Sequence, residues 1–91
     1  MPYITPHRRE RIDTLYEAPA NAGELNYVIT REITRYLAMH GASYTIFNEV
    51  MGAIEGARAE FYRRVVAPYE DEKRLANGDV YGTIVSEEEK V

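Results

Sequence analysis

The stretch YTIFNEVMGAIEGARAEFYRRVV, residues 44–66, carries the longest helical pattern in the chain. Its apolar side chains recur at spacings of three and four, which gathers them within about 100° of arc on one helix face. The set is Ile46, Phe47, Val50, Ile54, Ala57, Phe61 and Val65, with Met51 and Tyr62 at its edges. We therefore predict a long helix from about Ser43–Thr45 to Val66, which Pro68 ends because proline lacks the amide hydrogen.

A second long helix precedes it. Asn21-Ala22-Gly23-Glu24 is typical of a helix N-cap with an acid three residues on. The following apolar positions again share one face, and they are Leu25, Ile29, Ile33, Tyr36 and Leu37. His40-Gly41 predicts the end of this helix, because glycine readily adopts positive φ.

The sequence predicts shorter elements at the two ends of the chain. Thr5-Pro6 indicates an N-cap and a proline in the first turn of a short helix that reaches about Glu17 and that Pro19 ends. Its inward-facing residues are predicted to be Ile12, Leu15 and Tyr16. After Pro68, a turn or short helix over residues 69–76 is predicted to stop at Asn77-Gly78, and residues 80–85 form a short β-prone run.

These patterns predict a mostly α fold, with two long antiparallel helices, a short N-terminal helix, and a short C-terminal turn or extended segment. We expect a single helical domain over residues 1–85 and a disordered acidic tail over residues 86–91. A chain of 91 residues buries little surface alone, so a homo-oligomer is expected.

The composition of the chain limits its expected cellular location and its classes of binding partner. There is no cysteine, the net charge is −4, and no apolar run approaches the length of a membrane span or resembles a signal peptide. We therefore expect a soluble, cytoplasmic protein with no membrane partner. The only short basic segment is His7-Arg8-Arg9-Glu10-Arg11, which disfavours nucleic acid as a partner.

Two glycines interrupt the long helical pattern. Gly52 and Gly56 lie one turn apart with Ala53 beside them, and together they form a smooth strip away from the main apolar face. Glu49 and Glu60 project on the same side. The strip is compatible with close packing against the second helix, with contact to a second copy of the chain, or with a ligand on bare backbone. We take these five residues as the candidate oligomer interface.

The segment from Glu60 to Gly82 is dense in polar and aromatic side chains. Its arginines are compatible with a fork for a phosphate or carboxylate, or with pairing to Glu60, Glu70 or Asp71. Tyrosines suit stacking and hydrogen bonding at contact surfaces. The candidate ligand-binding residues are Tyr62, Arg63, Arg64, Tyr69, Asn77, Asp79 and Tyr81.

No catalytic residue and no metal ligand is assigned, because the phosphate-loop, dinucleotide and nucleophile-elbow motifs are missing from the sequence. One enzyme class stays open as an alternative, the magnesium-dependent all-α nucleotide pyrophosphohydrolases, which hold the ion with acids from paired helices. Glu49 and Glu60 are too far apart along one helix to share an ion, at roughly 16 Å. Magnesium is a cofactor only under this alternative.

Four segments carry a family resemblance: GELNYVIT, NEVMGAIE, EFYRRVVAPYEDEK and NGDVY. Together they resemble a family of small uncharacterised proteins found in phages and bacteria, over roughly residues 3–81. The resemblance implies an intracellular setting, is compatible with a viral origin, and carries over no catalytic residue. The expected function is that of a small oligomeric binding protein, for example a phage accessory protein that binds a host protein or a nucleotide-like anion. A purely structural protein–protein module is the further alternative.

Overall fold

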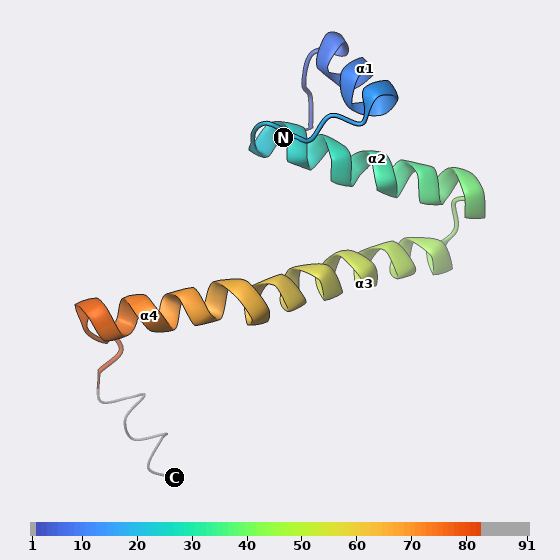
Figure 1. Ribbon diagram of the computed structural model, residues 1–91. Helices are drawn as coiled ribbons and strands as arrows, with labels where there is room; N and C mark the ends of the chain where they lie inside the picture. The colour runs from blue at the N-terminus through green and yellow to red at the C-terminus, as the bar shows by residue number, and fades with distance from the viewer. Residues whose placement is uncertain (1, 83–91) are drawn as a thin grey trace. The chain divides into compact units, whose positions relative to one another are not determined.

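The computed structural model describes residues 2–82, in which helices follow one another through short connections (Figure 1). The elements are α1 (Pro6–Leu15), α2 (Ala22–His40), α3 (Tyr44–Phe61), a π-helical turn η1 (Tyr62–Val66), and α4 (Ala67–Asn77). No strand occurs within residues 2–82. The predicted mostly helical fold is therefore confirmed. Residues 83–85 of the β-prone run, and the tail over residues 86–91, lie outside the described residues.

The chain divides into two units, Met1–Met51 and Gly52–Val91, and each is described by itself. The first unit holds α1, α2 and the first half of α3. The second holds the rest of α3, η1 and α4. The expectation of a single domain over residues 1–85 stays a prediction.

The local stop and start signals of the first unit work as predicted. Thr5 Oγ1 accepts the Arg8 amide at 3.2 Å, and Asn21 Oδ1 accepts the Glu24 amide at 2.9 Å, so both N-caps are formed. Gly41 has φ +86° and donates its amide to the Leu37 carbonyl at 2.8 Å, which ends α2. These caps satisfy amide and carbonyl groups that a helix end would otherwise leave without partners.

The prediction that Leu15 and Tyr16 of the first helix face inward together with Ile12 is wrong. That residue is buried, with 9% of its surface exposed, whereas Leu15 is 59% and Tyr16 90% exposed. The helix ends at Leu15, and Tyr16 takes a left-handed conformation with φ +55°, so the face does not continue. Helix α1 therefore offers only one side chain to a hydrophobic contact.

The prediction that Pro68 ends the third helix is also wrong. In an α-helix, Pro68 would lack the hydrogen bond to the Arg64 carbonyl and its ring would clash with that carbonyl. The chain instead widens into η1, where the Ala67 amide bonds to the Tyr62 carbonyl five residues back. A π turn accommodates one extra residue without ending the helix. The helical chain thus continues to Asn77, where Gly78, with φ +93°, stops it as predicted.

Candidate functional site

Five of the predicted ligand-binding residues line one hollow of about 590 Å³ in the second unit. They are Tyr62, Tyr69, Asn77, Asp79 and Tyr81. We call this hollow the α4 groove. Most of its lining comes from one side of α4 and from the residues that follow it, so the turn after Asn77 brings distant side chains together. Whether the groove binds a ligand stays a prediction.

The π turn and Gly78 together build the α4 groove. The Tyr62 hydroxyl donates to Glu70 Oε1 at 2.8 Å, although eight residues separate the two. Two α turns span about seven residues, and the extra residue of η1 makes up the eighth. After Gly78, Asp79 lies 3.8 Å from Arg74 and accepts the Tyr81 amide at 2.8 Å. The hydrogen bond to Glu70 and the negative charge there raise the pKa of the Tyr62 phenol.

The two arginines predicted for the same site are not part of the groove lining. Arg63 contacts Glu60 at 2.6 Å, and Arg64 lies 3.6 Å from the other oxygen of the same carboxylate. Glu60 is thus the partner of both, and neither ion pair involves Glu70 or Asp71. Such exposed pairs one helical turn apart contribute little to stability. The fork expected for a phosphate is not assembled in the groove.

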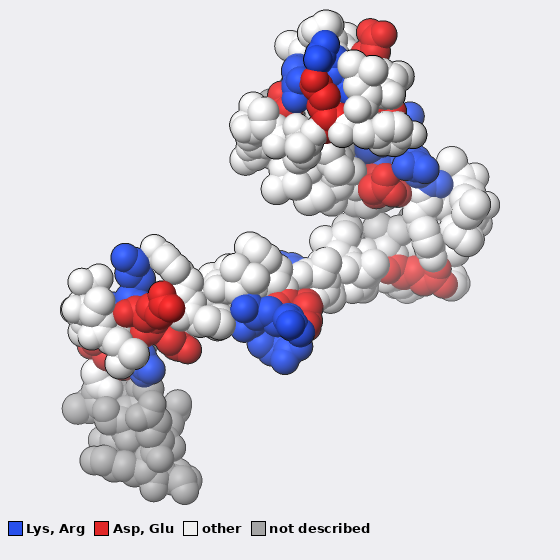
Figure 2. Space-filling model, viewed as in Figure 1, with Lys and Arg blue, Asp and Glu red and all other residues white. Residues whose placement is uncertain are grey.

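The electrostatics of the groove are mixed rather than basic. Three acids line it, Glu70, Asp71 and Asp79, against the bases Lys73 and Arg74. The Lys73 ammonium lies 5.5 Å from the centre of the Tyr69 ring, a cation–π contact. Figure 2 shows the same mixture on the face in view, with basic and acidic side chains beside one another in each unit. The groove therefore favours stacking and polar contacts over capture of an anion.

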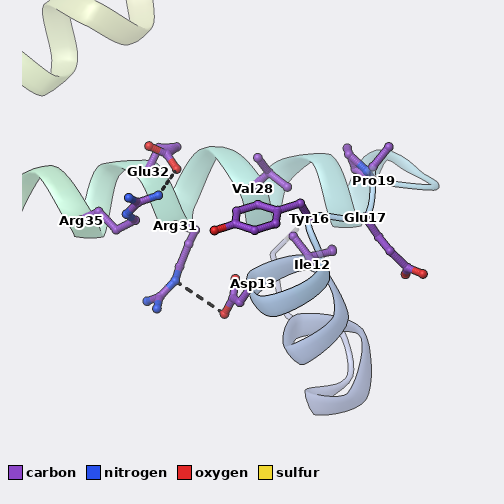
Figure 3. A pocket seen from close by; sticks show the side chains of 10 residues that line it. Ile12, Asp13, Tyr16, Glu17, Pro19, Val28, Arg31, Glu32 and Arg35 are labelled. Carbon is purple, nitrogen blue, oxygen red and sulfur yellow. Dashed lines mark hydrogen bonds and ion pairs between the residues drawn. The ribbon is translucent and has the colours of Figure 1, made fainter.

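A second hollow, of about 480 Å³, lies between α1 and α2 within the first unit (Figure 3). Tyr16 lies across it, and Asp13, Arg31 and Arg35 line it. Both arginines have partners, because Arg31 lies 3.6 Å from Asp13 and Arg35 contacts Glu32 at 2.9 Å. This hollow was not predicted from the sequence. Its one available signal was the spacing of Arg31 and Arg35, one turn apart on the polar side of the second helix.

Charged groups dock α1 on α2. The Arg8 guanidinium makes two hydrogen bonds to the Glu24 carboxylate, at 2.8 and 2.6 Å, and Arg8 and Arg11 both bind Glu17. The Ala20 amide adds a bond of 2.9 Å to Glu24, which is only 5% exposed. The arginine contacts lower the pKa of Glu24, and they lower that of Glu17 to about 2. Two of the three arginines in the short basic segment over residues 7–11 are thus paired with acids.

This docking uses the polar side of α2. The α2 residues that bond to α1 are Glu24, Tyr27 and Arg31, at the spacing of one helix face. The apolar face predicted for the same helix points elsewhere, and two of its members remain half exposed, Leu25 at 50% and Ile29 at 48%. Helix α1 therefore does not cover Leu25 and Ile29 on the apolar face of α2.

The apolar face of α3 and η1 is also partly exposed. Its large members are exposed by 48% for Phe47, 40% for Ile54, 60% for Phe61 and 55% for Val65. No residue from Gly52 to Gly82 is buried. We call the set Phe47, Val50, Ile54, Ala57, Phe61 and Val65 the α3 seam.

The predicted glycine strip has a different environment. A methyl group built on Gly52 or Gly56 would have no heavy atom within 4 Å in the described part of the chain. Glu49 accepts a hydrogen bond from the Tyr36 hydroxyl at 2.7 Å, and Glu60 holds the two arginines. The role of these residues and of Ala53 in an oligomer stays a prediction.

The described residues contain no group of three histidine, aspartate or glutamate side chains close enough to hold a metal ion. None of their helices is both long enough and apolar enough to span a membrane.

These features define a small all-helical protein whose short first helix is held by ion pairs and whose two amphipathic helices keep exposed apolar faces. The chain belongs to the family described as Domain of unknown function (DUF6899), whose family model matches residues 1–80. Comparison with curated proteins and with solved structures gave no significant match.

Proposed function

We propose that the chain is a small homo-oligomeric binding protein whose apolar helix faces form its interaction surface. One observation carries the proposal: α1 docks on the polar side of α2, while large apolar residues of α2 and α3, among them Ile29, Phe47 and Phe61, remain exposed. A helix in water gains most of its stability from packing such a face. Exposed rows of large apolar side chains typically mark protein–protein contacts.

The first partner in this proposal is a second copy of the chain, and the resulting oligomer presents its polar surfaces to another protein. A phage accessory role toward a host protein, in the cytoplasm, is part of the proposal and rests on the family resemblance. A nucleotide-like anion has less support, because Arg63 and Arg64 bind Glu60 and three acids line the α4 groove.

The magnesium-dependent pyrophosphohydrolase alternative finds no added support in the geometry. Within residues 2–82 no three candidate ligands converge. The remaining alternative, a purely structural module, shares the proposed interface and differs in having no outside partner.

Light scattering coupled to gel filtration tests the proposal. The unmodified chain is expected to run as an oligomer, and the double variant Ile54→Gln/Phe61→Gln as a smaller species. Met39→Gln is the matched control, because Met39 is 82% exposed on α2 and lies outside the apolar face. A monomeric unmodified chain at high concentration, or an equal loss of assembly in the control, would contradict the proposal.

A thermal-shift screen of nucleotides with and without magnesium separates the other classes. Stabilisation by magnesium would favour the enzyme alternative, because a ligand that binds the folded state raises its melting temperature. Stabilisation by nucleotide alone would favour an anion site. We expect neither.

A further inference from the structure

We propose that the α3 seam packs against the α3 seam of a second copy in antiparallel orientation, with Ile54 of each chain opposite Ala57 of the other. The inference rests on the proposed self-association and adds the partner, its direction and its register. Three features of the seam carry it: the spacing, the alternation of side-chain size, and the distribution of charge.

The spacing is that of a coiled-coil seam. Phe47, Val50, Ile54, Ala57 and Phe61 follow one another at intervals of three, four, three and four residues. This alternation is the heptad pattern of helices that pair along a narrow line. It runs along α3, which is one unbroken helix from Tyr44 to Phe61.

The π turn extends the seam by one position. The next heptad position after Phe61 is Arg64, whose charge would interrupt an apolar contact. The wider turn of η1 carries Arg64 toward Glu60, 3.6 Å away, and leaves Val65 to take the seam position. The accommodation of Pro68 thus also keeps a guanidinium out of the interface.

Side-chain size favours the antiparallel direction. Pairing Ile54 with Ala57 also pairs Val50 with Phe61, and Phe47 with Val65, so every layer joins a larger side chain to a smaller one. A parallel, in-register pair would instead stack Phe47 on Phe47 and leave a hole between two alanines at residue 57. Helix interfaces fill space best when large and small residues face each other.

The distribution of charge also favours the antiparallel direction. The antiparallel register places the basic pair Arg63-Arg64 at the level of Glu49 of the second copy. A parallel pair would instead bring the arginines of the two copies to the same level and gather like charge at one end of the interface, which is unfavourable. At the flanks of the seam, Arg58 would lie opposite Met51 of the second copy, whose apolar surface its aliphatic stem can cover.

The area still exposed on the seam contributes to the contact. A buried phenylalanine removes roughly 150–250 Å² from water. Phe47 and Phe61 are 48% and 60% exposed, so the four phenylalanines of two seams have roughly 320–540 Å² left to bury. A specific interface buries on the order of 1,200–2,000 Å² in total, so the remaining seam residues and the side chains at its flanks must supply the rest.

Disulfide trapping tests the register, because the chain has no cysteine of its own. Ile54→Cys and Ala57→Cys chains, one of them carrying a size tag, are unfolded together, refolded and mildly oxidised. We expect a crosslinked heterodimer from this mixture and from Val50→Cys with Phe61→Cys. Only residues whose Cα atoms approach within about 7 Å can be bridged. Val50→Cys mixed with Ile54→Cys is the out-of-register control and should give no heterodimer.

The outcomes separate this inference from the proposed function. Crosslinking of Val50→Cys with itself would show a parallel pair and overturn the proposed direction. An oligomer by light scattering that gives neither expected heterodimer would overturn the α3 pairing and leave self-association intact. A monomer whose seam variants lose thermal stability would mean that the chain covers the seam itself, and both proposals would fall.

Discussion

The glycines inside the long helix and those at helix ends differ in backbone conformation. Gly52 and Gly56 have ordinary helical conformations and open space around them, whereas Gly41 and Gly78 have φ +86° and +93°. The last two need glycine for their backbone conformation. The first two weaken the helix, because glycine is less favourable there than alanine.

Replacing either helical glycine by alanine should therefore stabilise the chain. We expect Gly52→Ala and Gly56→Ala each to raise the free energy of unfolding by about 1 kcal/mol, measured by chemical denaturation. Gly78→Ala is the opposite control and should destabilise, because alanine strains at positive φ. If the glycine strip were the oligomer interface, the two stabilising variants would instead weaken assembly in light scattering.

At the scale of elements, α1 depends on its charged contacts with the start of α2. Its polar and apolar residues are not separated onto two faces, and Ile12 is the only buried hydrophobic residue in the described chain. Arg8 and Arg11 instead supply charge-assisted hydrogen bonds to Glu17 and Glu24, which are among the stronger ones in proteins.

Docking of α1 should consequently fail in acid. The pKa of Glu17 is lowered from 4.5 to about 2, and that of Glu24 is lowered as well. A lowered pKa means that the folded state favours the charged form, so the stabilisation is complete above about pH 4.5 and is lost as pH falls toward 2. The protection factors of residues 6–15, which correct hydrogen exchange for its intrinsic slowing in acid, should fall over this range before those of residues 25–40.

The double variant Glu17→Gln/Glu24→Gln controls for the effect. The protection factors of its α1 amides should already be low at neutral pH and should change much less between pH 4.5 and 2. Protection of α1 that persists in this variant would show that the ion pairs do not hold the helix.

The π turn is the other element whose cause can be tested. Pro68→Ala restores an amide hydrogen and removes the clash with the Arg64 carbonyl, so η1 should revert to α-helix. Tyr62 and Glu70 would then lie about 80° apart around the helix instead of on one face. The pKa of Tyr62, now raised by Glu70, should fall toward 10.0. Titration of the Tyr62 ring by NMR measures this change. An unaltered pKa would mean that Pro68 does not cause the turn.

For the molecule as a whole, folding and association should be coupled. Neither unit buries an extended apolar core in the described residues, so the proposed oligomer would supply the apolar burial that the chain lacks. A tenfold rise in chain concentration should raise the melting temperature by about 2–4 °C, because mass action favours the folded dimer. The Ile54→Gln/Phe61→Gln variant should melt at a concentration-independent temperature, and an unmodified chain that does the same would contradict the coupling.

Local signals explain what could be predicted from the sequence. Asn21, Gly41 and Gly78 act through their own conformation or their nearest neighbours, so both ends of α2 and the end of α4 were correctly anticipated. Pro68 is also a local signal, but its effect depends on whether the helix can widen into a π turn. The rule that proline ends a helix does not take this possibility into account.

Local signals also explain which of the candidate site residues come together. Asn77, Asp79 and Tyr81 join Tyr62 and Tyr69 because the turn at Gly78 returns the chain, and that turn is readable from sequence. Arg63 and Arg64 do not join this group because both pair with Glu60, which lies about one helical turn away. Docking of α1 by charge was missed because apolar periodicity, the main guide to packing, has nothing to detect in that helix.

The extra residue of η1 has a consequence for the evolution of the family. A relative that lacks a proline at the position of Pro68 has no need of a wide turn, and retaining the surplus residue would rotate its α4 away from the face that Tyr62 and Glu70 share. Loss of the proline and deletion of one residue between positions 62 and 66 should therefore occur together among relatives. In an alignment of the family, a single-residue gap at this place should track the absence of the proline.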